Sequence, residues 1–289
     1  MPAAVATTVL LWASAFVGIR SAGHHLSAGA LAQLRMGVGS LSLGLMVLVR
    51  RERLPARADL PRVLVCGLLW FAVYFVALNA AEHSVDAGTA SMLVNVAPIM
   101  VALLAAVTLG EGLSGGLIGG CAIALAGAGL IALGSGTHHA TPAGVGLCLL
   151  AALAYAVGVV LQKPLLARSS ALATTWACCT VGALACTVFT PALVREAPHA
   201  GVSALTWAVY LGVFPTAIAF TTWAYALART SASRLAVTTY VVPPITLLMA
   251  WLMLGELARG TPELFHIKHD PGGITDIVVV LHFIGNPSP

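Results

Sequence analysis

Charged residues are scarce in this sequence. Fourteen basic and ten acidic residues make up 8% of the 289 residues, whereas about 25% is usual for a globular domain. A soluble chain of this length needs many charged side chains on its surface, so a soluble enzyme, a disordered chain and a nucleic-acid-binding protein are all poorly supported. A hydrophobic content of 59% and a mean hydropathy of +0.96 instead indicate an all-α integral membrane protein.

Motifs for metal, cofactor or covalent chemistry are lacking as well. The six cysteines lie inside apolar runs without a C-x-x-C, so they are expected to be packing thiols. The histidine pairs at 24–25 and 138–139 lack converging partners for a metal. No phosphate loop, nucleotide fingerprint or Ser-His-Asp order is present. The sequence therefore predicts no metal, no cofactor and no enzymatic activity.

Long apolar runs are what the sequence does have. A membrane helix needs about 20 predominantly apolar residues, and the run 112–162 divides at the turn-rich stretch 135–142. Nine spans result: 3–20, 27–49, 63–81, 88–109, 115–134, 144–162, 172–193, 205–227 and 235–254.

The basic residues predict the orientation of these spans. With a cytoplasmic N-terminus, nine loop Arg and Lys residues lie on the inner side and three on the outer side. Five of the nine follow the second span, between Arg50 and Arg62. We expect a multi-pass protein of the cell (inner or plasma) membrane.

The two halves of the chain resemble each other. A shift of 145 residues places Ala87 on Ala232, Pro98 on Pro243, and the Leu-Gly-Glu triplet ending at Glu111 on the triplet ending at Glu256. A unit of five spans is odd, so consecutive copies enter the membrane from opposite sides, an arrangement found in secondary transporters. The predicted units are a first repeat (1–136), a loop (137–143), a second repeat (144–256) and a tail (257–289).

The segment Trp12-Ala-Ser-Ala-Phe16 and the two repeated stretches that end at Glu111 and Glu256 resemble the EamA-type drug/metabolite transporter superfamily. The resemblance implies ten helices in two inverted five-helix repeats. It also implies a carrier, often an exporter, of amino acids or other small metabolites. In that family the cavity is formed mainly by helices one to four and six to nine.

The tail 257–289 departs from this pattern. Its longest apolar stretch, Ile277 to Ile284, is too short to span a membrane. The tenth helix is therefore atypical or missing, and nine spans are clear. Either the tail is a native external segment or it reflects a shifted reading frame; the intact pattern before it favours the second.

Three polar side chains inside spans are candidates for substrate binding. Arg35 would suit an anionic group, with snorkelling to the interface as the alternative. Asn79 and Asn95 must find partners inside the bundle, either on a substrate or on a neighbouring helix. Glu111 follows a span and is expected to cap the next one. No carboxylate lies at the centre of a span, so the coupling ion stays open.

Aromatic side chains and prolines complete the predicted site. The aromatic candidates for the substrate path, with an interfacial belt as the alternative, are Trp12, Tyr74, Tyr155, Trp223 and Tyr240. Helix kinks are expected at Pro98, Pro243 and Pro215.

These features favour a secondary transporter that exports small metabolites or amino acids by alternating access through a central cavity. Uptake of metabolites is one alternative, and a non-transporting membrane scaffold is another. The expected partners are the lipid bilayer and a small-molecule substrate, an amino acid or metabolite whose anionic group would suit Arg35. No nucleic acid is expected, and the protein is either a monomer or a homodimer.

Overall fold

The structure, a computed structural model, describes residues 1–112, 115, 118–119 and 141–254, and among them eight helical segments are long and apolar enough to cross a membrane. These eight correspond to the expected spans other than 115–134, which, with Glu256 and the tail 257–289, lies outside the described residues. Their outward surface is apolar: Val107, Val202 and Leu41 are exposed by 86%, 83% and 76%. Such exposed side chains suit contact with lipid.

Four spans belong to the first half of the chain. The first is α1 (Pro2–Gly23) and the second is α2 (Ala28–Arg50). The third consists of η1 (Arg57–Asp59), α3 (Leu60–Leu68), η2 (Leu69–Val73) and α4 (Tyr74–Ala81), and the fourth consists of α5 (Ala87–Val94) and α6 (Ala97–Leu109).

Four further spans follow in the second half. The first is α8 (Pro142–Leu165), and the second consists of α9 (Ala171–Ala185), η3 (Cys186–Phe189), α10 (Thr190–Glu196) and η4 (Ala197–His199). The third consists of α11 (Gly201–Leu211), η5 (Gly212–Ile218) and α12 (Ala219–Leu227). The fourth consists of α13 (Ala232–Val237), η6 (Thr238–Val241) and α14 (Val242–Leu254). Helix α8 begins inside the expected loop 137–143.

Matching spans start with the same kind of side-chain cap. Ser27 accepts a hydrogen bond from the third backbone N–H of α2, and Ser170, 143 residues later, does the same for α9. Asp86 caps α5 and Ser231, 145 residues later, caps α13. Small side chains with an oxygen stabilise helix starts in this way, so the two halves begin these helices alike.

The third span of each half contains a π-helical segment. Leu69–Val73 interrupts the first, and Gly212–Ile218, which contains Pro215, interrupts the second; the shift of 145 places the first segment on 214–218, inside the second. A π segment widens the helix locally and is frequent at functional sites. Pro215 thus lies in an irregular stretch of its span, and the kink expected there stays a prediction.

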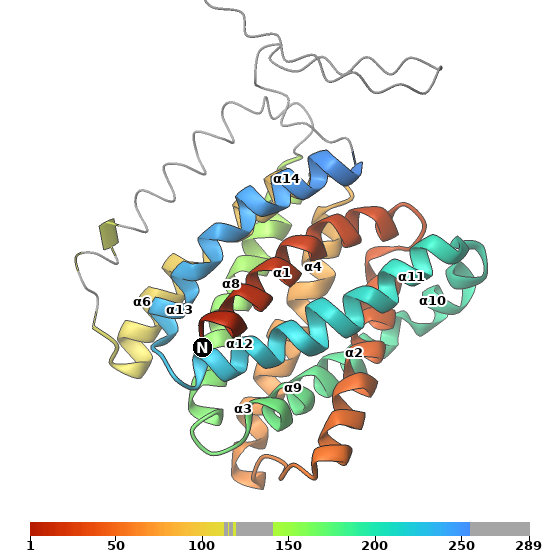
Figure 1. Cartoon of the computed structure of the whole chain (residues 1–289). Coiled ribbons are helices and arrows are strands. Elements are labelled where there is room, and N and C mark those ends of the chain that lie inside the picture. Colours follow the sequence, from red (N-terminus) through yellow and green to blue (C-terminus); the bar gives the residue numbers. More distant parts are fainter. Residues whose placement is uncertain (113–114, 116–117, 120–140, 255–289) are drawn as a thin grey trace, which may run out of the picture.

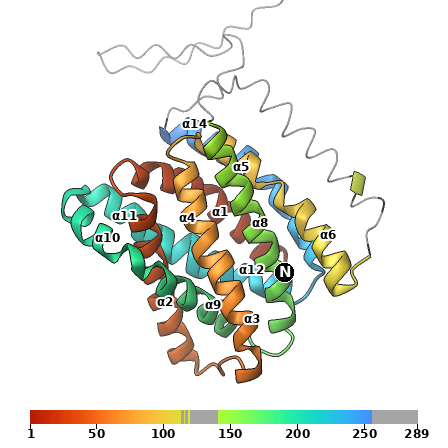
Figure 2. The ribbon, with the colours of Figure 1, turned by 180° about the vertical axis from the view of Figure 1, so that it is seen from behind.

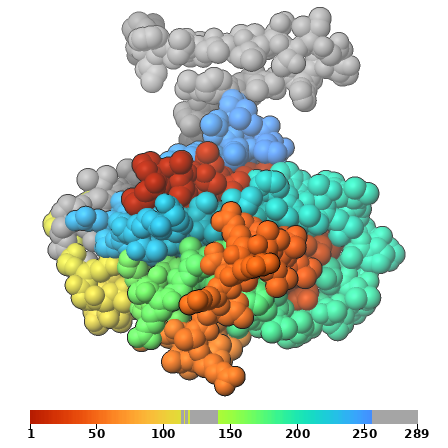
Figure 3. Space-filling model, turned by 60° about the horizontal axis from the view of Figure 1, so that its bottom comes forward, coloured from red at the N-terminus to blue at the C-terminus, as the bar shows by residue number. Residues whose placement is uncertain are grey.

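Helices of the two halves are interleaved. A Cβ added to Gly67 in α3 would lie 2.7 Å from the Cys178 carbonyl oxygen of α9, and one added to Gly212 would lie 2.9 Å from the Arg35 carbonyl oxygen of α2. Each third span therefore packs closely on the second span of the other half. Figure 3 shows red, orange and yellow helices of the first half beside green, cyan and blue helices of the second.

The fourth spans cross each other at their breaks. Helix α5 packs on α14, and α6 packs on α13, so the two spans run in opposite directions. Figures 1 and 2 show these pairs from both sides. Asn95 and Val96 separate α5 from α6, and η6 separates α13 from α14. Pro98 and Pro243 each stand second in the helix that follows the break, where proline is tolerated.

Glu111 joins the two halves at one end of the molecule. Its carboxylate accepts hydrogen bonds from the backbone N–H groups of Ala232 (2.7 Å) and Ser233 (3.0 Å) and from the Ser233 hydroxyl (2.7 Å). It therefore caps α13 of the other half, whereas the sequence predicts a cap on the next span, which lies outside the described residues. A carboxylate stabilises a helix N-terminus through these N–H groups and the helix dipole.

Glu111→Gln is expected to lower the stability of the protein at pH 7 by about 1 kcal/mol, the usual contribution of such a cap. Burial raises the pKa of Glu111, but the hydrogen bonds from Ser233 and Ala232 outweigh burial and hold it below its ordinary value of 4.5. A depressed pKa in the folded state stabilises above the ordinary value, and that contribution is lost as pH falls through the folded-state pKa.

Thermal unfolding of the detergent-solubilised chain from pH 7 to pH 3 measures this contribution. The gap between wild type and Glu111→Gln should close below pH 4.5. Glu52→Gln, in the loop after α2, serves as the control and should match wild type throughout. A gap that stays constant with pH would contradict the assignment of the cap to the charged carboxylate.

Candidate substrate cavity

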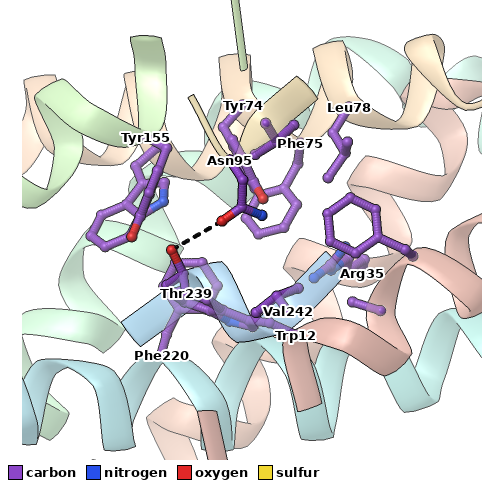
Figure 4. Close-up of a pocket in the computed structure, with 14 residues that line it drawn as sticks. Trp12, Arg35, Tyr74, Phe75, Leu78, Asn95, Tyr155, Phe220, Thr239 and Val242 are labelled. Carbon is purple, nitrogen blue, oxygen red and sulfur yellow. Dashed lines mark hydrogen bonds between the residues drawn. The ribbon is translucent and has the colours of Figure 1, made fainter. Parts of the chain in front are cut away.

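A cavity of about 40 Å³ lies where the two broken fourth spans cross. Its polar lining consists mainly of Arg35 from α2, Asn95 from the first break and Thr239 from η6. Its aromatic lining consists of Trp12, Phe16, Trp70, Tyr74, Phe75, Tyr155 and Phe220. Both halves of the chain contribute to each kind of lining (Figure 4). The space is enough for about three water molecules.

Arg35 is the charged group of this cavity. Its side chain is 2% exposed, and its Nε donates a hydrogen bond to the Thr216 hydroxyl at 2.9 Å. That hydroxyl donates in turn to the Leu211 carbonyl, so it is oriented to accept from Arg35. The guanidinium carbon lies 4.1 Å from the centre of the Phe75 ring, a cation–π contact. Nη1 is buried without a hydrogen-bond partner.

The Asn95 side chain faces the other half of the chain. The Thr239 hydroxyl lies 3.3 Å from Asn95 Oδ1 and 2.8 Å from the Ala236 carbonyl oxygen of α13, so its proton is shared between the two. Asn95 Nδ2 donates to the Ser91 carbonyl at 2.8 Å. In Figure 4 this pair lies between Arg35 on one side and Tyr155 on the other.

The aromatic side chains form one continuous wall. The ring centres of Trp12 and Phe220 are 5.2 Å apart, those of Trp70 and Phe220 are 5.1 Å apart, and those of Trp70 and Tyr155 are 5.3 Å apart. These separations are typical of favourable aromatic pairs. The wall offers an apolar surface to a ligand, and its rings come from α1, η2, α8 and α12.

Five of the eight predicted site residues line the cavity: Trp12, Arg35, Tyr74, Asn95 and Tyr155. The other three lie outside the lining. The Asn79 amide donates to the Ala28 carbonyl at 3.2 Å, so it joins α4 to α2. Trp223 packs behind Trp12, with ring centres 4.9 Å apart. Tyr240 does not line the cavity, whereas the neighbouring residue Thr239 does.

Several lining residues are ones that the sequence analysis did not single out. Phe75 and Phe220 are related by the 145-residue shift, and both line the cavity, so the repeat itself carried a signal for them. The same shift pairs Asn95 with Tyr240, whereas in the structure Asn95 contacts Thr239, which lies in the 3-10 segment η6. No sequence signal marks Trp70, which lines the cavity, or Thr216, which holds Arg35.

No group of three or more potential metal ligands comes together in the described part of the chain. The lining of the cavity combines one cation, neutral polar groups and a wall of aromatic rings.

The model of the EamA-like transporter family matches residues 3–133 and 142–260. This chain belongs to the EamA-like transporter family. The EamA-like chain is thus a multi-pass membrane transporter and not an enzyme. The two matched ranges leave out the centre of the chain and almost all of the tail.

Curated relatives agree with this assignment. Over 254 residues the EamA-like chain is 37% identical to a probable terminal-alkyne amino-acid exporter of Streptantibioticus cattleyicolor, covering 88% of this chain and 85% of the relative. It is 26% identical over 267 residues to a probable amino-acid metabolite efflux pump of Escherichia coli K12, covering 87% and 86%. A solved crystal structure has the same fold, with a TM-score of 0.70, 22% identity and coverage of 90% of this chain and 88% of the other.

Proposed function

We propose that this transporter exports small metabolites or amino acids by alternating access through the cavity at the crossing of its fourth spans. The observation that carries the proposal is the buried Arg35, whose Nη1 has no hydrogen-bond partner beside a wall of aromatic rings. A buried charge inside a membrane bundle is costly and is normally kept for function. The names of the amino-acid and metabolite exporters among its relatives support the direction of transport.

Two inverted repeats would supply the moving parts. The opposite directions of the fourth spans, the matched helix caps and the two ranges of the family match all support such repeats. In this arrangement the site lies at the interface of the repeats, and rocking of one against the other opens it to either side. The excess of basic residues in the inner loops supports a cytoplasmic N-terminus and a cell-membrane location.

The size of the cavity supports a closed state. About 40 Å³ holds about three water molecules but not an amino acid, so a substrate enters only when the helices separate. The breaks before Pro98 and Pro243 and the π segment at Pro215 are the places where backbone hydrogen bonds are already interrupted. Bending there would cost less than in a regular helix.

Flux from proteoliposomes tests the proposal. The purified chain is reconstituted in vesicles loaded with a mixture of amino acids and metabolites, and their loss is followed by mass spectrometry against empty vesicles. We expect selective loss of a small set of compounds. Accumulation from outside without efflux would favour uptake, and no flux from well-folded protein would favour the scaffold alternative.

A further inference from the structure

We infer that the substrate is an organic carboxylate with an apolar body and no ammonium group. This inference rests on the proposed transport through the cavity and narrows its substrate class. A transporter of free amino acids would have to bind a carboxylate and an ammonium group together, and the cavity offers unequal environments to the two charges.

Arg35 provides the binding site for the anionic group of the substrate. The guanidinium has five N–H donors, and Thr216 takes the one on Nε, while Nη1 is buried without a partner. In the described part of the chain no carboxylate forms an ion pair with Arg35. The Nη1 group, buried without a partner, can donate charge-assisted hydrogen bonds to a bound anion.

Two further donors lie in the same lining. Trp12 Nε1 and Trp70 Nε1 are both buried without hydrogen-bond partners. An indole N–H can only donate, and a buried donor without a partner costs about 1–3 kcal/mol. An ammonium group, which has only donors, would leave these groups without partners.

An ammonium group finds no counterion in the described lining. Arg35 is the single charged side chain there, and no Asp or Glu lines the cavity. Neutral oxygens such as Asn95 Oδ1 and the ring faces can contact a cation, but a cation–π contact contributes about 0.5–2 kcal/mol. Repulsion from Arg35 in a poorly solvated cavity opposes that gain. A carboxylate without an amine therefore offsets the one charge of the described lining, whereas a zwitterion adds an ammonium group that Arg35 repels.

The apolar body fits the side of the cavity away from Arg35. Figure 4 shows Tyr155 and Arg35 on opposite sides of the Asn95–Thr239 pair. The Tyr155 side is also where the rings of Trp12, Trp70 and Phe220 meet. A substrate with its carboxylate at Arg35 would place its apolar part against this wall, where burial of apolar surface stabilises it.

Three compounds that share one ring and chain length test the inference. They are 3-phenylpropanoate (an anion), phenylalanine (a zwitterion) and phenethylamine (a cation). Ligand-induced thermal stabilisation of the detergent-solubilised full chain gives an apparent affinity for each. We expect 3-phenylpropanoate to bind at least 10-fold more tightly than phenylalanine, and phenethylamine not to bind. In Arg35→Met the preference for the anion should disappear.

Phenylalanine binding as tightly as 3-phenylpropanoate would overturn the inference, as would failure of all three to bind. Neither result decides the proposed function, because the metabolite-mixture flux assay measures transport without assuming a substrate class. Efflux of amino acids but not of simple carboxylates would refute the inference and leave the exporter intact. Absence of all flux would refute the proposed function itself.

Discussion

Arg35→Met is expected to reduce substrate efflux from proteoliposomes about 100-fold. Removing one partner of a buried charged pair costs about 2–5 kcal/mol of binding free energy, and each 1.4 kcal/mol is tenfold in affinity. The same change should leave thermal stability unchanged or raise it, because the guanidinium of Arg35 is buried with Nη1 unpartnered and an apolar side chain avoids that cost. Initial efflux rates at equal protein incorporation measure the first effect, and thermal unfolding measures the second.

Two variants serve as comparisons for Arg35. Arg35→Lys keeps the charge but loses the planar set of donors, so it should retain part of the activity. Arg57→Met removes an exposed arginine from η1 and should transport like wild type. An Arg35→Met protein that folds and keeps more than half of the wild-type flux would show that Arg35 is not at the substrate site.

Gly182→Ala is expected to destabilise the protein by about 1–3 kcal/mol, as overpacking of a core usually does. An added Cβ would lie 2.6 Å from the Phe71 carbonyl oxygen and 2.7 Å from its carbon. The obstacle is backbone in the π segment Leu69–Val73, which cannot rotate away as a side chain can. Helix α9 must therefore move off the third span.

Gly37→Ala, in the middle of α2, is the matched control because nothing lies within 4 Å of its added Cβ. Alanine favours a helix over glycine by up to about 1 kcal/mol, so this variant should be as stable as wild type or more so. Thermal unfolding in one detergent compares the three proteins. Equal stability of Gly182→Ala and Gly37→Ala would refute the close contact between α9 and the π segment.

The membrane class and the transporter family follow from the sequence because they depend on local composition and on a repeat visible in one chain. A run of apolar residues is a span wherever it packs, so eight spans appear as helices. Phe75 and Phe220 are related by the repeat and both line the cavity, so the repeat also identifies residues of the site. The inverted arrangement of the repeats stays a proposal.

The partners of the site residues could not be predicted, because they depend on contacts far apart in the sequence. Arg35 meets Thr216, 181 residues away, and Glu111 caps α13, 121 residues away. Asn79 satisfies its amide on the Ala28 carbonyl and does not line the cavity. A polar residue in a span must find a partner, but the sequence alone does not distinguish a backbone carbonyl from a substrate.

A cysteine at position 95 tests the central claim, passage of the substrate through the cavity. Asn95→Cys proteoliposomes are treated with a thiol-specific methanethiosulfonate reagent, and efflux is measured before treatment, after it and after reduction. Val107→Cys, at an 86% exposed position on α6, and the unmutated chain receive the same treatment as controls. We predict that efflux stops only in Asn95→Cys and returns on reduction. Full efflux through Asn95→Cys protein shown by mass to be modified would contradict the claim.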